Sequence, residues 1–146
     1  MDVRTAIKER RSCRAFSKDP SSKAALHQVL EAATWAPSPL NAQPWDFVVI
    51  TADEIKKQII AEAGKNREWA VEKSGWGWLG KYDLDFLASV PAIIAVAGDP
   101  KKSGVDQFSD EGSKAYEHAC AAAVQNMLLA AHALSLGTLW FTMFDR

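Results

Sequence analysis

Three arginines and a serine stand close together near the N-terminus, in the run Arg10-Arg11-Ser12-Cys13-Arg14. Guanidinium groups bind phosphate through charge-assisted, partly bidentate hydrogen bonds, and a serine hydroxyl adds one more donor. The run therefore predicts a site for a phosphate-bearing ligand at the end of a short helix. The alternative is a solvated basic surface, which is the commoner role of a short run of charges.

A second group of polar side chains lies in the segment Ala36-Pro37-Ser38-Pro39-Leu40-Asn41-Ala42-Gln43-Pro44-Trp45. Its three prolines stiffen the chain between a helix and a strand, and a rigid loop that carries amides suits the polar edge of a planar ring. Ser38, Asn41 and Gln43 would make those contacts. Taken alone, such a segment is more often a structural turn than a site.

A third segment joins an alanine-rich helix, residues 121–136, to the sequence Gly137-Thr138-Leu139-Trp140. Small side chains allow a helix to approach its neighbours closely, and glycine is a common residue just past a helix end. We expect Gly137 to cap the helix and the backbone after it to face a cofactor. The alternative is a buried core helix with an ordinary glycine cap.

Helices and strands must position these three segments. The spacing of apolar residues predicts helices that begin after Asp2, after Ser22, at about Asp53 and at about Asp110, the last one running to Leu136. Short apolar runs predict strands at Trp45–Thr51, Ala92–Ala97 and Leu139–Phe144. Residues 64–85 show the weakest periodicity. Because two helices precede the first strand, we expect an α+β fold, with a small mixed or antiparallel sheet packed by helices.

Composition narrows the classes of function. The 146 residues fit one domain, 1–146, and the formal net charge of −1 gives no general attraction to nucleic acid or to an anionic membrane. There is no apolar run long enough for a membrane span and no apolar segment of a signal peptide at the N-terminus. The two cysteines are too few for a disulfide framework, so we expect a cytoplasmic protein.

Two other patterns are weaker candidates for a site. Gly75-Trp76-Gly77-Trp78-Leu79-Gly80 matches the G-x-G-x-x-G dinucleotide fingerprint, but it follows a charged stretch, Arg67–Ser74, that looks helical rather than a buried strand. We therefore interpret it as a mobile loop that covers a pocket and forms one wall of the acceptor site, with glycine hinges and tryptophan contacts. His118 and His132 share a helix face roughly 20 Å apart, at about 1.5 Å per residue, so we expect no metal site.

Taken in order, the three segments resemble the nitroreductase family. An RRS-x-R box near the start, an APS-x-x-N-x-QPW loop and a QN-x-LLAA-x-ALGLG-x-W helix exit recur in that family in this order. In this chain they are RRSCR, APSPLNAQPW and QNMLLAAHALSLGTLW. The resemblance extends from Val3 to Thr142 and is weakest across residues 64–85.

The resemblance implies a homodimer that binds FMN at the subunit interface and passes hydride from NAD(P)H to a nitroaromatic, a quinone or a similar small acceptor. It implies that Arg10, Ser12 and Arg14 hold the phosphate and ribityl side, with help from the backbone or charge of Arg11. From the partner chain, Pro37, Ser38 and Asn41 would lie against the flavin, with Gln43 nearby. Backbone at Thr138, Leu139 and Trp140 would approach the ring. No side-chain nucleophile is implied, because the hydride transfer is flavin chemistry.

The chain departs from the family pattern at one point. Family members usually continue well past the Trp140 segment, into a stretch that adds basic contacts to the phosphate and embraces the partner subunit. This sequence stops at Arg146, so we expect a fragment or a shortened member. The alternative function is a flavin-binding or structural remnant without turnover.

Overall fold

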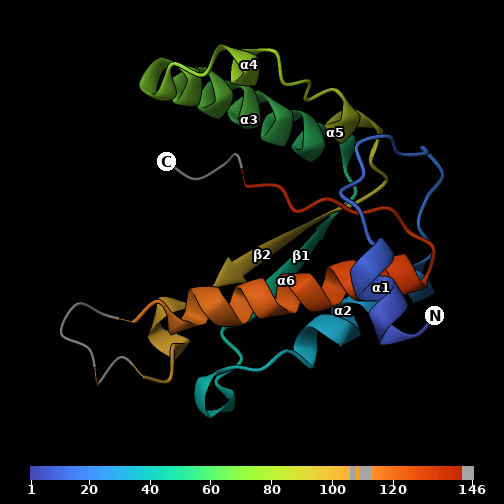
Figure 1. Cartoon of the computed structure of the whole chain (residues 1–146), viewed down its shortest axis with the longest axis vertical. Helices are drawn as coiled ribbons and strands as arrows, with labels where there is room; N and C mark the ends of the chain where they lie inside the picture. The colour runs from blue at the N-terminus through green and yellow to red at the C-terminus, as the bar shows by residue number, and fades with distance from the viewer. Residues whose placement is uncertain (106–107, 109–112, 143–146) are drawn as a thin grey trace. The chain divides into compact units, whose positions relative to one another are not determined.

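The computed structural model describes residues 1–105, 108 and 113–142 (Figure 1). Contacts divide the chain into two compact units. Unit 1 consists of Met1–Cys13, Ser21–Val49 and Ile94–Trp140, and unit 2 consists of Arg14–Pro20, Ile50–Ile93 and the residues after Trp140. The expectation that residues 1–146 form one domain stays a prediction, and each unit is described by itself.

In the described residues, unit 1 contains a two-stranded sheet, three α-helices and two short 3-10 helices. Its elements are α1 (Val3–Glu9), α2 (Lys23–Thr34), the 3-10 helix η1 (Pro39–Asn41), β1 (Trp45–Ile50), β2 (Ile93–Gly98), the 3-10 helix η2 (Pro100–Lys102) and α6 (Ala115–Ala133). The strands are antiparallel, because the Asp99 amide at the end of β2 donates to the Pro44 carbonyl, 2.7 Å away, at the start of β1. This small antiparallel sheet with its helices confirms the predicted α+β class.

Packing of α6 against α2 forms the core of unit 1, and the two helices lie side by side in Figure 1. Their facing side chains are mostly small, which lets the helices approach closely, and Asn126 Nδ2 donates across the contact to the Ala32 carbonyl at 3.1 Å. The buried side chains are Val29, Ala33, Ala36, Trp45, Ala119, Ala123, Met127 and Ala131.

Unit 2 is helical and contains α3 (Asp53–Ser74), α4 (Gly77–Gly80) and α5 (Phe86–Ser89). Lys56 fixes the start of α3, since its Nζ lies 2.7 Å from Asp53 Oδ1 and donates to the Val90 carbonyl at 3.3 Å. The hydrogen bond and charge of the Lys56 ammonium lower the pKa of the Asp53 carboxyl. Further along α3, Arg67 Nη1 donates to the Tyr82 carbonyl at 2.8 Å.

Helix α3 is longer than the periodicity of the sequence indicated. It continues through the first half of residues 64–85 and ends where Gly75 takes a left-handed conformation, with a φ of 69°. The helix therefore includes Arg67–Ser74, which confirms the helical interpretation of that charged stretch. None of the helices in the described residues is long and apolar enough to cross a membrane.

Two predictions about the end of α6 were wrong. The helix ends at Ala133, and Ser135 rather than Gly137 has the left-handed φ of 62°. The Ser135 amide donates to the His132 carbonyl and the Leu136 amide to the Ala131 carbonyl, at 2.9 and 2.8 Å, so a Schellman motif closes the helix two residues early. Residues 139–142 form no strand, and 143–144 lie outside the described residues, as does the predicted start near Asp110.

Candidate functional site

The end of α1 places the first predicted segment. Asp2 caps the helix by accepting hydrogen bonds from the amides of Arg4 and Thr5, and the Thr5 hydroxyl bond lowers the pKa of the Asp2 carboxyl. Arg10 is the residue at the other end, so the arginine run leaves the helix directly. This confirms that the run begins at a helix end.

Arg10 and Arg11 differ in what their side chains do. Arg11 Nη1 folds back onto the helix end and donates to the carbonyls of Lys8 and Arg10, at 2.8 and 3.0 Å. Basic groups stabilise the negative end of a helix dipole, so Arg11 acts partly as a helix cap. Arg10 is half-buried at the same end. A phosphate would therefore meet Arg10 as a binding side chain and Arg11 mainly as a nearby charge.

Ser12 lies next to the segment that follows α6. Ser12 and Thr138 form an isolated parallel bridge, and the Cys13 amide donates to the Thr138 carbonyl at 2.9 Å. Two predicted site segments from opposite ends of the chain thus meet within unit 1. The bridge at Thr138 lies one residue before the predicted strand Leu139–Phe144, of which the described residues 139–142 form no strand.

The Thr138 hydroxyl is the best indication that a ligand belongs at this junction. Thr138 Oγ1 is buried and has no hydrogen-bond partner among the residues that the structure describes. A buried hydroxyl without a partner costs about 1–3 kcal/mol, so a bound polar group that completed it would be favoured. Ser12 bridges to Thr138, and Arg10 lies two residues before Ser12, so the residue types at this junction fit an anionic, polyhydroxylated ligand such as FMN.

The second predicted segment is a loop whose polar residues hold one another. The Gln43 amide donates to Ser38 Oγ at 3.0 Å, and Gln43 Nε2 donates to Asn41 Oδ1 at 3.1 Å. Leu40, Asn41 and Gln43 all have a positive φ, of 50°, 54° and 46°. Non-glycine residues rarely adopt this conformation, and a cluster of three stores strain of the kind found at functional sites.

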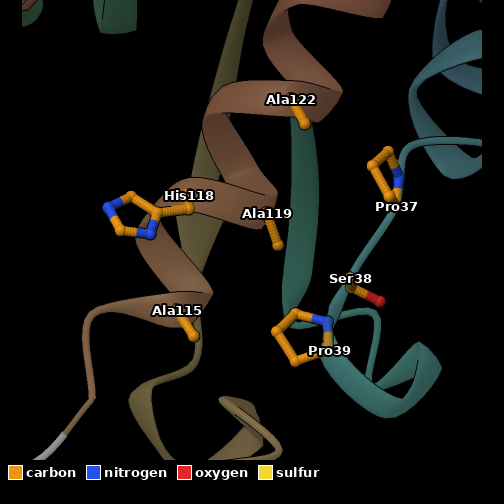
Figure 2. Close-up of a pocket in the computed structure, with 7 residues that line it drawn as sticks. All are labelled: Pro37, Ser38, Pro39, Ala115, His118, Ala119 and Ala122. Carbon is orange, nitrogen blue, oxygen red and sulfur yellow. The ribbon is translucent and has the colours of Figure 1, made fainter.

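The same loop borders a shallow hollow of about 240 Å³ beside the N-terminal half of α6. Figure 2 shows the rings of Pro37 and Pro39 opposite Ala115 and Ala119, with the His118 imidazole directed away from the loop. The position of this loop beside α6 was not predicted from the sequence. The sequence signal for this contact was the spacing of Ala115, Ala119 and Ala122, which places small side chains on one helix face.

The structure does not bring all the predicted residues of unit 1 together. The loop packs beside Ala115–Ala122, whereas Thr138 follows the other end of α6, beyond Ala133. At about 1.5 Å per residue these places are roughly 20 Å apart along the helix. The predicted site residues of unit 1 therefore form two separate groups, which we call the half-sites: Arg10–Ser12 with Thr138, and Pro37–Gln43. Leu139 and Trp140 continue from the first, half-buried and 46% exposed respectively.

Arg14 belongs to unit 2, where its side chain contacts Tyr82. Its Nε donates to the Tyr82 hydroxyl at 2.7 Å, and its guanidinium carbon lies 5.7 Å from the ring centroid. The Tyr82 ring in turn packs edge-on against Phe86, with centroids 6.4 Å apart. Arg14 is thus held by an aromatic cluster of its own unit.

The weaker candidates from the sequence do not form sites. The glycine-rich fingerprint follows helix α3, and Gly75 serves as the left-handed end of that helix, so the context of a dinucleotide turn is absent there. The described residues contain no group of His, Cys, Asp and Glu suited to a metal ion. Burial raises the pKa of the Cys120 thiol, which disfavours a reactive thiolate.

Comparison with known proteins gives a consistent result. The model of the Nitroreductase family matches residues 7–146. A protein of Archaeoglobus fulgidus, provisionally named NADH dehydrogenase/NAD(P)H nitroreductase, is 31% identical over 142 residues, which are 96% of this chain and 67% of that protein. A relative of the same name from Methanothermobacter thermautotrophicus is 30% identical over 140 residues, 96% of this chain and 60% of its own length. The chain thus spans about two thirds of these relatives.

A solved structure agrees with the sequence matches. A provisionally named nitroreductase of Desulfovibrio desulfuricans, determined in complex with FMN, superposes with a TM-score of 0.70 and 33% sequence identity. The match covers 99% of this chain and 70% of that one.

Proposed function

Because the chain belongs to the nitroreductase family, we propose that it binds FMN and passes hydride from NAD(P)H to a small acceptor such as a nitroaromatic or a quinone. The names of its relatives and the FMN complex of a structural neighbour support this activity. The observation that carries the proposal is the junction of Ser12 with Thr138, whose buried hydroxyl has no hydrogen-bond partner in the described part of the chain.

In this proposal the side chains of the chain bind and orient the cofactor. Arg10, Ser12 and Arg14 hold the phosphate and ribityl groups, and the charge of Arg11 adds to the attraction. Backbone at Thr138, Leu139 and Trp140 approaches the ring. The bound flavin supplies the hydride chemistry, so no side-chain nucleophile is needed.

We propose further that the working site is shared by two copies of the chain. The two half-sites lie at opposite ends of α6, so Pro37, Ser38, Asn41 and Gln43 would contact a flavin held by Arg10, Ser12 and Thr138 of a second copy. Trp35 and Leu40 support a partner on the loop side, since each exposes 79% of its surface. Large apolar side chains exposed in this way often mark protein interfaces.

We place the protein in the cytoplasm, with a small-molecule acceptor and no nucleic acid or membrane partner. A sequence with only two cysteines has too few for a disulfide framework, which supports a reducing compartment. The net charge of −1 supports the absence of a nucleic-acid partner.

The absorbance spectrum of the purified chain, with and without added FMN, tests binding. We expect a yellow protein that retains FMN on desalting and oxidises NADH or NADPH when a nitroaromatic or a quinone is supplied. A yellow protein that leaves both nicotinamides unchanged would instead support the flavin-binding alternative without turnover. A chain that folds but retains no FMN would contradict the proposal.

A further inference from the structure

The segment Asp99–Gly104 contacts the Pro37–Gln43 loop and its flank at two points. At one end, the Asp99 amide donates to the Pro44 carbonyl at 2.7 Å, and Pro44 is fully buried. At the other end, Gly104 lies so close to Pro39 that a Cβ atom on Gly104 would be 2.8 Å from the Pro39 carbonyl oxygen. The segment therefore contacts the loop at Pro39 and contacts Pro44, the residue that follows the loop.

The Asp99–Gly104 segment is itself rigidly held. Asp99 Oδ1 caps η2 by accepting from the Lys101 amide at 2.9 Å. Ser103 is completely buried, and its Oγ accepts from the Val105 amide at 3.3 Å, across Gly104. Gly104 has a φ of 77°, a left-handed conformation that glycine adopts without penalty. The contact with Pro39 thus requires glycine for two reasons, its φ and its missing side chain.

The loop needs such support from outside. Three of its non-glycine residues, Leu40, Asn41 and Gln43, have positive φ, and such strain persists only where the surroundings over-determine the conformation. Hydrogen bonds within the loop, from Gln43 to Ser38 and to Asn41, supply part of the constraint. The contact at Gly104 supplies a constraint from a different part of the chain.

We propose that Gly104 is a positioning residue for the Pro37–Gln43 loop: its bare backbone lets the Asp99–Gly104 segment brace Pro39, and the brace holds Ser38, Asn41 and Gln43 in the orientation that meets the flavin. The second half of this statement rests on the proposed function. Gly104 lies outside all three sequence motifs. Its role follows from the close approach alone.

Replacement of Gly104 by asparagine tests the brace against a matched control. Asparagine tolerates a left-handed φ, so Gly104→Asn chiefly adds a side chain that must push against Pro39. Gly75→Asn is the control, because Gly75 has a similar φ of 69° but open space where the side chain would go. Two readouts apply: hydrogen exchange of the Gln43 amide in FMN-free protein, and the affinity and visible spectrum of bound FMN.

We expect Gly104→Asn to speed exchange at the Gln43 amide, to shift the visible band of the bound flavin and to weaken FMN binding by about tenfold, roughly the loss of one good hydrogen bond. Gly75→Asn should match the wild type in the exchange rate of the Gln43 amide, in the visible band of the bound flavin and in FMN affinity. Equal behaviour of the two variants would overturn the proposal. A merely structural role would lower the unfolding temperature without moving the flavin spectrum or the affinity of the folded protein.

A milder variant decides the question if Gly104→Asn does not fold. Ser103→Ala removes only the hydroxyl that fixes the turn around Gly104, and we expect faster Gln43 exchange with FMN binding about two- to threefold weaker. Unchanged exchange and affinity in that variant would overturn the brace. If the wild type bound no FMN, the proposed function would fail by itself, and the exchange experiment would still test the brace.

Discussion

The three arginines of the Arg10–Arg14 run have different partners, although the sequence presents them as one cluster. Arg11 is bound to the end of its own helix, and Arg14 is bound to Tyr82 in unit 2. Arg10 is the C-cap residue of α1 and lies two residues before Ser12, which bridges to Thr138. The single cluster of the sequence is therefore divided between the two units.

We expect Arg10→Ala and Arg14→Ala each to weaken FMN binding by about ten- to a hundredfold, because a hydrogen bond to a charged group contributes roughly 1.5–3 kcal/mol. Titration of the flavin-free protein with FMN measures the change. Gly77→Ala should leave the affinity nearly unchanged, since a side chain at Gly77 meets nothing within 4 Å. Arg4→Ala, on the exposed first turn of α1, is the matched arginine control. Silent arginine variants together with a damaging Gly77→Ala would place the phosphate at the glycine-rich segment instead.

The buried hydroxyl of Thr138 predicts opposite effects on stability and on binding. Thr138→Val keeps the shape of the side chain and removes the unpartnered hydroxyl, so the flavin-free protein should gain about 1 kcal/mol in free energy of unfolding. The same change should weaken FMN binding by about three- to tenfold, because the hydroxyl is then unavailable to the cofactor. Denaturant unfolding and FMN titration measure the two effects.

Thr51→Val, at an exposed position, is the control for Thr138→Val and should change neither quantity. An unchanged FMN affinity in Thr138→Val would remove Thr138 from the site.

At the residue scale, the sequence identified the polar side chains but did not predict their hydrogen bonds, backbone conformations or burial. Ser38, Asn41 and Gln43 were identified from a motif, and the structure shows them hydrogen-bonded to one another. The positive φ of Leu40 was not predictable, because leucine carries no signal for that conformation. Nor was the unpartnered Thr138 hydroxyl, since burial of a single atom depends on contacts between distant segments.

At the scale of elements, the starts of α1, α2 and α3 and the first two strands followed local rules, whereas the ends of α3 and α6 did not. Asp2 and Ser22 cap α1 and α2 as their sequence positions predict, because capping needs only the next three residues. The end of α6 was misplaced because a Schellman motif can form around serine as well as glycine. The length of α3 was missed because its sequence is largely polar and exposes much of its surface.

Helix α4 carries the two tryptophans that we expect to form a wall of the acceptor pocket. Trp76 and Trp78 are 58% and 62% exposed and stack on each other, with centroids 5.9 Å apart and planes 23° apart. Such a surface suits contact with a planar acceptor. Replacing both by alanine should change the ratio of kcat/KM for a nitroaromatic and a quinone, while FMN affinity stays within about twofold.

Trp69→Ala, on α3 and outside the stacked pair, is the control for acceptor preference. Since neither Trp76 nor Trp78 belongs to the buried core, both replacements should leave the unfolding temperature nearly unchanged. Loss of folding in the double variant would show that these side chains are structural and would contradict the acceptor wall.

At the scale of the whole molecule, the sequence predicted the α+β class because elements and their order are local properties. It did not predict the distance between the two half-sites, which is set by the length of α6 and by which end of that helix each segment meets. The division of the chain into two units could not be predicted from the sequence either. Arg14 follows Cys13 directly in the chain, yet it packs with Tyr82 in unit 2.

A shared site requires that FMN binding and self-association depend on the same loop. We expect light scattering to give twice the mass of one chain at working concentration with FMN present, since a two-fold interface uses the same patch on both copies. Leu40→Asn should favour the monomer and weaken FMN binding together, because it removes a side chain that is 79% exposed. Asparagine also suits the φ of 50° at this position, so the variant should fold at least as stably as the wild type.

Ile55→Asn is the matched control for Leu40→Asn, since Ile55 is 44% exposed on α3 in unit 2 and lies outside both half-sites. It should leave the mass and the FMN affinity unchanged. The mass of the assembly and the FMN affinity, measured together, decide whether two copies share the site. If the wild type were monomeric and still held FMN with full affinity, or if Leu40→Asn lost the dimer without losing FMN, then the loop would not reach the cofactor of a second copy. In that case Arg10, Ser12 and Thr138 would have to hold the flavin within one chain.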